Sequence, residues 1–174
     1  MDSRNIPYMI IGGQAVLLYG EPRLTRDIDI TLGVDIEKLP EIISLTKECR
    51  LKILTENPKD FVQKTWVLPT FNKESGFRVD FIFSWSPYEK EALSRVRIVN
   101  IENYPVKFAS PEDVIIHKML AGRPRDFEDI KSILRKQKVN KKLITYWLKI
   151  FSQGLKKDLQ KEFESLWQEV QNEL

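Results

Sequence analysis

Three aspartates occupy positions from which their carboxylates could share divalent metal ions. Asp27 and Asp29 lie in a segment, residues 27–32, that alternates polar and apolar side chains, as a half-buried strand does. Their side chains therefore leave one face of the strand, about 6.5–7 Å apart along it. Asp80 lies in a second alternating segment, so we expect it to join the same face if the two strands are neighbours.

Such a group of carboxylates suits phosphoryl-transfer chemistry. Like charges this close need a counter-charge, and ligands that are all oxygen favour Mg²⁺ or Mn²⁺. Paired ions can stabilise both the attacking and the leaving oxygen of a phosphoryl displacement. An Asp-x-Asp strand alone is also typical of a solvated strand face, or of a metal-dependent glycosyltransferase, so the interpretation depends on its neighbours.

A glycine pair upstream supplies the first of these neighbours. Gly12-Gly13 follows a short apolar segment, Tyr8–Ile11, and precedes a predicted helix over residues 14–19. Backbone N–H groups at such a strand-to-helix turn can bind phosphate. The spacing is neither that of a dinucleotide fingerprint nor that of a P-loop. A glycine pair is usually only a tight turn, but beside an Asp-x-Asp strand it predicts a triphosphate site.

Periodicity and turn residues predict the remaining elements. Strands are expected over residues 65–71 and 77–85, joined by a hairpin turn at 73–76, with brief edge strands at 96–99 and 106–108. Helices are expected over residues 36–48, 125–135, 141–151 and 155–173. Another helix should begin at the capping box Ser110-Pro111-Glu112-Asp113. We therefore expect an α/β core over residues 1–110 and a helical part over 111–174 packed on it.

Composition places few limits on function. The chain has 174 residues, 42% of them hydrophobic, and a formal net charge of +3. This mild positive charge suits a protein that handles nucleotides or RNA, although most proteins of this charge bind neither. The single cysteine, Cys49, excludes an internal disulfide. We expect a cytoplasmic protein without a membrane span, because the apolar segment near the N-terminus ends at the glycine pair.

As an ordered set, three motifs resemble the polymerase-β-like nucleotidyltransferase superfamily. They are Ile10-Ile11-Gly12-Gly13-Gln14-Ala15, the segment Arg23-Leu24-Thr25-Arg26-Asp27-Ile28-Asp29-Ile30, and Val79-Asp80-Phe81. A later helical lysine, Lys118, and Arg125-Asp126-Phe127-Glu128-Asp129 make the chain most similar to the AbiEii-type nucleotidyltransferases, known as toxins of toxin–antitoxin pairs. The resemblance covers residues 8–134. It implies the polymerase-β-like α/β (α+β) fold, a mixed sheet packed on helices with C-terminal helices.

The resemblance also implies a role for each matching residue. Asp27, Asp29 and Asp80 would be the ligands of Mg²⁺ or Mn²⁺, and Asp80 would help to deprotonate the acceptor hydroxyl. The backbone of Gly12 and Gly13 would hold the nucleoside triphosphate, such as ATP. The flanking residues of that nucleotide site would be Arg23, Thr25 and Lys118, with Asp126 orienting Lys118 or the acceptor.

Several alternatives stay open for the C-terminal residues. Lys118 could be a surface lysine, and Asp126 and Asp129 could form ordinary surface ion pairs. The single histidine, His117, is interpreted as a structural or surface residue rather than a general base. A basic stretch without an acid suits tRNA or RNA, yet a solvated helix end gives the same pattern: Lys131, Arg135, Lys136, Lys138, Lys141 and Lys142.

The activity expected is therefore transfer of a nucleoside monophosphate from a nucleoside triphosphate to an acceptor hydroxyl. A tRNA or other RNA end is the first acceptor suggested, and an antitoxin is a possible partner implied by the resemblance. A small molecule or a protein hydroxyl are alternatives. A non-catalytic nucleotide- or RNA-binding member of the same fold is a further hypothesis.

Overall fold

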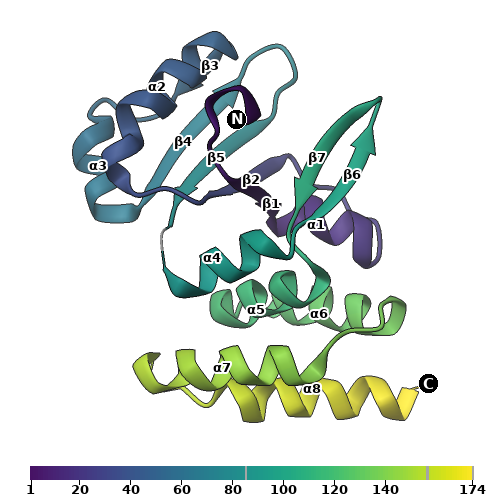
Figure 1. Ribbon diagram of the computed structural model, residues 1–174. Helices are drawn as coiled ribbons and strands as arrows, with labels where there is room; N and C mark the ends of the chain where they lie inside the picture. Colours follow the sequence, from purple (N-terminus) through teal and green to yellow (C-terminus); the bar gives the residue numbers. More distant parts are fainter. Residues whose placement is uncertain (85, 156, 174) are drawn as a thin grey trace. The chain divides into compact units, whose positions relative to one another are not determined.

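A computed structural model describes residues 1–84, 86–155 and 157–173, in which the chain forms two compact units (Figure 1). The α/β unit comprises Met1–Gln14 and Leu24–Phe108, and the helical unit comprises Ala15–Arg23 and Ala109–Leu174. The helix α1 (Gly12–Tyr19) therefore begins in the α/β unit and continues into the helical unit. Residues 15–23 group with the C-terminal helices, so neither unit is a single continuous stretch of the chain.

The α/β unit contains a seven-stranded mixed sheet in the order β3-β4-β5-β2-β1-β7-β6. β2 is parallel to β5, and β1 is parallel to β7, whereas the other neighbours are antiparallel. The strands are β1 (Tyr8–Ile11), β2 (Asp27–Leu32), β3 (Leu51–Ile53), β4 (Val67–Asn72), β5 (Arg78–Phe83), β6 (Arg97–Ile101) and β7 (Tyr104–Phe108).

Short helical elements connect these strands. They are η1 (Asp2–Arg4), α1 (Gly12–Tyr19), η2 (Ile36–Lys38), α2 (Leu39–Glu48), α3 (Pro58–Thr65) and α4 (Pro87–Ser94). Pro40 lies in the first turn of α2, as predicted. The predicted single helix over residues 36–48 is wrong in one detail, because its first three residues form the 3₁₀ turn η2 before the α-helix begins.

The sheet buries one face in an apolar core. Side chains of β2, β4 and β5 that point away from the aspartates pack with Leu39 and Ile42 of α2 and with Val62 of α3. The buried sheet residues of this core include Leu32, Leu68, Val79, Phe81 and Phe83. The alternation of each strand therefore leaves Asp27, Asp29 and Asp80 on the opposite face, as the sequence pattern predicts.

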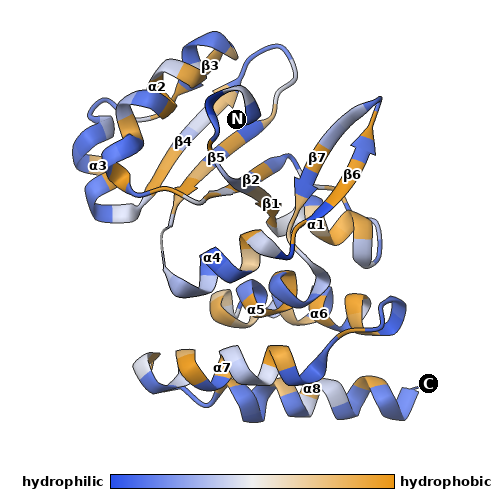
Figure 2. Ribbon diagram, in the orientation of Figure 1, coloured by the Kyte–Doolittle hydropathy of each residue, from blue (hydrophilic) through white to orange (hydrophobic). Residues whose placement is uncertain are grey.

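The helical unit consists chiefly of α5 (Pro111–Ala121), α6 (Pro124–Lys136), α7 (Lys141–Leu155) and α8 (Leu159–Glu173). Apolar and polar residues alternate along α7 and α8 (Figure 2), and the apolar stripe buries Ile144, Trp147, Leu148 and Phe163. The predicted start of the last helix at Leu155 is wrong, because Leu155 ends α7 and a short turn precedes α8.

Residues 15–23 are fastened to the helices of this unit. The Tyr19 hydroxyl donates a hydrogen bond to the carbonyl oxygen of Ala109 at 2.9 Å. The backbone N–H of Glu21 donates to Ser132 Oγ at 3.2 Å, and a methyl group on Gly20 would lie 2.2 Å from the same oxygen. An alanine at position 20 would therefore displace the Ser132 hydroxyl that accepts from Glu21.

Three helices, α3, α4 and α5, begin with the same capping pattern. The side chains of Asn57, Ser86 and Ser110 each precede a proline and accept a hydrogen bond from a backbone N–H three residues later, on Asp60, Glu89 and Asp113. The start of α5 at Ser110 confirms the predicted capping box. We did not predict α3 and α4, although their sequences carry the same signal.

Replacing Ser110 by alanine should lower the free energy of unfolding by about 1–2 kcal/mol, because the buried Asp113 N–H loses its acceptor. Urea denaturation measures the change. Ser94→Ala is the control, because Ser94 lies at the exposed C-terminal end of α4, and it should cost less than about 0.5 kcal/mol. Equal losses in the two variants would contradict the capping role.

Other strand predictions hold in part. The predicted strand over 65–71 begins later, because Thr65 ends α3, and β3 was not predicted at all. The strand predicted to reach Trp85 ends at Phe83, and Trp85 itself lies outside the described residues. Of the two predicted edge strands, only β6 lies at the edge, since β7 pairs with both β6 and β1. Within the described residues, no helix has the length and apolar character needed to cross a bilayer.

Candidate active site

The three aspartates meet on neighbouring strands. The parallel pairing of β2 with β5 places Asp29 beside Asp80 and Asp27 beside Arg78. Adjacent strands lie about 4.8 Å apart, and paired residues leave the same face of the sheet. The predicted proximity of Asp80 to the Asp27 and Asp29 pair is therefore confirmed by the strand register.

The glycine turn lies directly against these carboxylates. Ile11, the last residue of β1, pairs with Asp29, so the chain turns into α1 beside the Asp29 side chain. A methyl group on Gly12 would lie 2.0 Å from Asp29 Oδ2, and one on Gly13 would lie 2.6 Å from Thr25 Oγ1. Gly12 also has a φ of +65°, which L side chains adopt only at a cost. Both the contact and the backbone conformation therefore require glycine at this position.

Two side chains near the turn approach the start of β2. Gln14 Nε2 lies 3.4 Å and Thr25 Oγ1 lies 3.5 Å from the carbonyl oxygen of Asp27. Both distances are long for hydrogen bonds, so these contacts are weak. Gly12, Gly13, Thr25 and the aspartates thus form one continuous surface of the α/β unit.

An arginine that we did not predict shares this surface. Arg78 Nε donates a hydrogen bond to Asp80 Oδ1 at 2.8 Å. This hydrogen bond, followed by the charges of Asp80, Asp27 and Asp29, raises the pKa of the Arg78 guanidinium despite the opposing effect of burial. Its position two residues before Asp80 in an alternating strand was the signal that could have identified it.

The aspartates as they lie are not a preformed metal cage. Within residues 1–84, 86–155 and 157–173, no group of three His, Cys, Asp or Glu side chains has an arrangement ready to hold a metal ion. Asp80 is directed to Arg78 instead.

The other predicted residues form a second cluster, inside the helical unit. Lys118 of α5 is 6% exposed, and its Nζ lies 2.9 Å from Asp126 Oδ1 and 2.6 Å from Asp129 Oδ2 of α6. Arg23 donates from Nε and from Nη2 to the two oxygens of Asp129, at 2.8 and 2.9 Å. The backbone N–H of Arg123 donates to Asp126 Oδ2 at 3.1 Å. Lys118, Asp126 and Asp129 are therefore buried partners rather than surface residues.

The pKa of Asp129 reflects this cluster. Burial acts to raise the pKa of its carboxyl, but hydrogen bonds from Arg23 and Lys118 outweigh burial and hold the pKa below the ordinary value of 3.8. A lowered pKa in the folded state stabilises the fold above the unfolded-state value and ceases to do so as the pH falls through the folded-state value. The stabilisation by Asp129 is therefore complete at neutral pH and lost only below about pH 3.8.

Asp129→Asn should lower the free energy of unfolding by about 3 kcal/mol at pH 7, because the buried Lys118 and the half-buried Arg23 lose a shared partner. The difference from the unchanged protein should shrink at a pH below 3.8, as the pH falls through the lowered pKa of the folded-state aspartate. Urea denaturation at both pH values tests this expectation. Glu128→Gln, at a neighbouring exposed carboxylate, should change stability by less than about 0.5 kcal/mol. A cost that is independent of pH would contradict the assignment.

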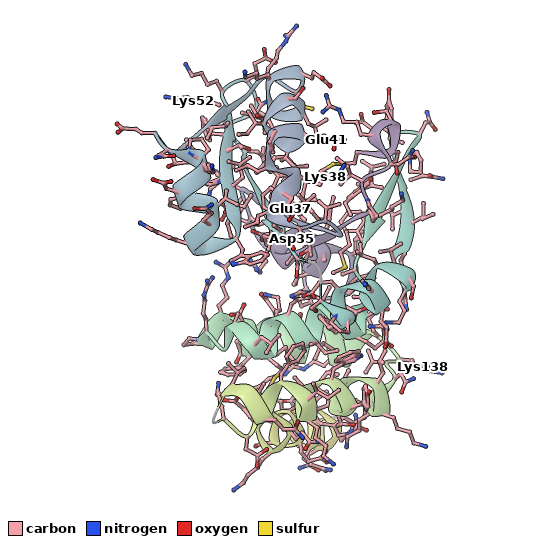
Figure 3. The ribbon with its side chains drawn as sticks, turned by 60° about the vertical axis from the view of Figure 1, so that its left-hand side comes forward. Asp35, Glu37, Lys38, Glu41, Lys52 and Lys138 are labelled. Carbon is pink, nitrogen blue, oxygen red and sulfur yellow. The ribbon has the colours of Figure 1, made fainter. Side chains whose placement is uncertain are left out.

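The basic stretch is largely neutralised by acids elsewhere in the helical unit. Lys131 and Arg135 pair with Glu169 and Glu173 of α8, and Lys141 pairs with Glu164. Lys136 pairs with Glu21 at 2.8 Å. Lys138 extends outward between α6 and α7 (Figure 3). The structure therefore favours the solvated helix end over an RNA-binding strip.

Two cavities elsewhere in the protein do not have the charge expected of a triphosphate-binding site. An apolar cavity of about 580 Å³ lies among η2, α2 and α3, with Ile36, Ile43 and Val62 in its lining. Its polar rim includes Glu37, one of several charged side chains along η2 and α2 in Figure 3. A smaller cavity of about 280 Å³ in the helical unit is lined by as many acids as arginines. Neither offers a surplus of positive charge for a triphosphate.

The sheet topology and the aspartates beside a glycine turn define the polymerase-β-like nucleotidyltransferase fold. Three solved structures share the fold. An antigenic nucleotidyltransferase-like protein from Paracoccidioides brasiliensis is 23% identical, with 76% of this chain and 69% of that chain covered and a TM-score of 0.51. The lincosamide antibiotic adenylyltransferase LnuA is 18% identical, covering 76% and 88%, with a TM-score of 0.51. The antibiotic-resistance factor ANT(2'')-Ia is 20% identical, covering 99% and 89%, with a TM-score of 0.54.

The chain belongs to the family described as nucleotidyltransferases of unknown function (DUF6036), whose model matches residues 1–174. Among curated proteins, none matches this sequence. The expectation of a nucleotidyltransferase is thus confirmed at the level of the superfamily and the family. The narrower similarity to AbiEii-type proteins is not among these findings.

Proposed function

We propose that this nucleotidyltransferase moves a nucleoside monophosphate from a nucleoside triphosphate, such as ATP, to an acceptor hydroxyl at Asp27, Asp29 and Asp80. One observation carries the proposal. Asp29 lies in register with Asp80 on a parallel neighbouring strand, and the Gly12 turn packs against the Asp29 carboxylate. Carboxylates and a phosphate-binding turn are therefore part of one surface.

The donor set fits Mg²⁺ or Mn²⁺. Asp27, Asp29 and Asp80 offer only carboxylate oxygens, which these hard cations prefer, and they share one face of adjacent strands. The hydrogen bond to Asp80, and then the charges of Asp80, Asp27 and Asp29, raise the pKa of Arg78, as a cation beside these carboxylates should show. A bound ion would supply Lewis-acid polarisation of the α-phosphate and charge neutralisation.

Residues of the chain itself would bind the phosphates and accept the proton. Backbone N–H groups of Gly12 and Gly13 would hold the β- and γ-phosphates. Asp80 would accept the proton of the acceptor hydroxyl at a carboxylate oxygen. The acceptor oxygen then forms a bond to the α-phosphorus, the bond from the α-phosphorus to the bridging oxygen breaks, and pyrophosphate leaves. Positioning and electrostatics would provide most of the rate enhancement.

Strand order suggests on which side each substrate lies. The order β1-β2-β5-β4 runs from the glycine turn through Asp29 to Asp80 and then to β4. The triphosphate would therefore lie towards β1 and the acceptor towards β4. On that side Phe71 pairs with Arg78, and Lys52 pairs with Phe71, so an aromatic ring and a cation follow the carboxylates on the same face.

This acceptor side favours an RNA end, with tRNA as the first example, because a base can stack on an aromatic ring and phosphate can pair with a cation. Support for an RNA acceptor therefore comes from Phe71 and Lys52, because the residues of the basic stretch are mostly ion-paired. A small-molecule hydroxyl is the second candidate, because two similar folds belong to antibiotic adenylyltransferases. The proposal also includes the roles that the AbiEii resemblance implies: Arg23 and Lys118 at the nucleotide site, and Asp126 orienting Lys118 or the acceptor. An antitoxin partner is part of it for the same reason.

Incubation with each α-labelled triphosphate, Mg²⁺ or Mn²⁺, and separate pools of tRNA, other RNA and small hydroxyl compounds tests the function. We expect label on an acceptor together with one equivalent of pyrophosphate. Calorimetry with each triphosphate runs in parallel. Binding without transfer to any acceptor would favour the non-catalytic alternative, and transfer that survives loss of Asp29 would refute the site.

A further inference from the structure

Arg78 places a positive charge next to the aspartates of the proposed metal site. Its Nε lies 2.8 Å from Asp80 Oδ1, and the strand register places its residue beside Asp27. The side chain is 48% exposed, whereas that of Asp80 is 16% exposed. A half-exposed ion pair contributes little to stability, so a purely structural role does not explain a cation beside Asp27 and Asp80.

The same contact competes with metal binding. The Nε–H of Arg78 occupies one lone-pair direction of Asp80 Oδ1 that a divalent ion could otherwise use. The guanidinium charge beside that oxygen would also repel the ion.

We propose that Arg78 is a built-in counter-cation that competes with a divalent ion for Asp80, and that it thereby sets the metal affinity of the site. The inference rests on the proposed function of Asp27, Asp29 and Asp80. Arg78 is a positioning residue, because it acts on the metal through Asp80. Without metal it offsets part of the negative charge of the carboxylates, so binding of the ion becomes a competition between two cations.

Titration of the protein with Mn²⁺ alone, followed by electron paramagnetic resonance of the unbound ion, measures this competition without any turnover. Arg78→Gln should bind Mn²⁺ about tenfold more tightly than the unchanged protein, because a charge-assisted hydrogen bond no longer competes. Arg78→Met keeps an aliphatic stem without the charge and should behave alike. Arg78→Lys keeps the charge and should restore an affinity within about threefold of the unchanged protein.

Arg26→Gln is the matched control. Arg26 immediately precedes Asp27 and carries the same charge, but Asp80 bonds to Arg78. Its removal should change Mn²⁺ affinity by less than about threefold, which is what screened surface charge provides. Equal tightening in Arg26→Gln and Arg78→Gln would overturn the proposal, and so would unchanged or weaker binding in both neutral Arg78 variants.

Asp29→Asn separates failure of this inference from failure of the proposed function. If Asp29→Asn loses Mn²⁺ binding while the Arg78 variants bind as the unchanged protein does, the carboxylate site stands and the role of Arg78 is refuted. If Asp29→Asn binds Mn²⁺ as the unchanged protein does, the metal site itself is wrong. Circular dichroism of each variant shows that the fold is retained.

Discussion

Replacing Asp29 by asparagine should lower the rate of nucleotidyl transfer by on the order of 10³-fold, equivalent to about 4 kcal/mol of transition-state stabilisation. Asp29 is central among the carboxylates, since it pairs with Asp80 on one side and with Ile11, next to the glycine turn, on the other. The asparagine side chain has nearly the same shape, so the fold should be retained. The loss would therefore report on charge and metal binding.

Initial rates of label transfer, at saturating triphosphate and Mg²⁺, measure this effect. Glu37→Gln is the control, because it removes one carboxylate of the same unit at an exposed position on η2. We expect its rate to stay within about twofold of the unchanged protein. A rate for Asp29→Asn within tenfold of the unchanged protein would show that catalysis takes place elsewhere.

Replacing Gly12 by alanine should reduce transfer by about 10²-fold or more and lower stability by about 1–2 kcal/mol. The added methyl group would lie 2.0 Å from Asp29 Oδ2, so either the carboxylate or the phosphate-binding turn must move. The φ of +65° adds backbone strain to this clash. Displacement of a reacting group by about 1 Å is enough to cause such a loss of rate.

Gly76→Ala separates the two causes. Gly76 has a φ of +71° in the hairpin turn between β4 and β5, but nothing lies within 4 Å of an added methyl group. This variant should therefore show the backbone cost, about 1–2 kcal/mol, with transfer within about twofold of normal. Thermal unfolding and the transfer assay on both variants make the comparison. A similar loss of activity in the two would mean that Gly12 acts through stability alone.

Local patterns predicted the elements of the carboxylate surface well. The alternation from Asp27 to Leu32 coincides with β2, because a strand with one buried face repeats every two residues. The capping serine Ser110 located the start of α5 for a similar reason, since the cap satisfies N–H groups within its own turn. The predicted proximity of Asp80 required only that β2 and β5 be neighbours.

Such local patterns could not predict contacts between distant parts of the chain. Arg23 and Asp129 are 106 residues apart, and no local periodicity shows that a loop arginine will pair with a carboxylate of α6. Lys118 was expected as a surface or substrate-binding lysine for the same reason. β3 has three residues, too few to display a period, whereas α3 and α4 could have been found from their capping residues.

The discontinuous course of the helical unit has a consequence for how the protein is made. Its segment Ala15–Arg23 leaves the ribosome early, whereas Ala109 and Ser132, which bind Tyr19 and Glu21, are synthesised about a hundred residues later. A fragment that begins at residue 109 would lack that segment and its hydrogen bonds to Ala109 and Ser132. The helical unit is therefore complete only when an early and a late part of the nascent chain have both been synthesised.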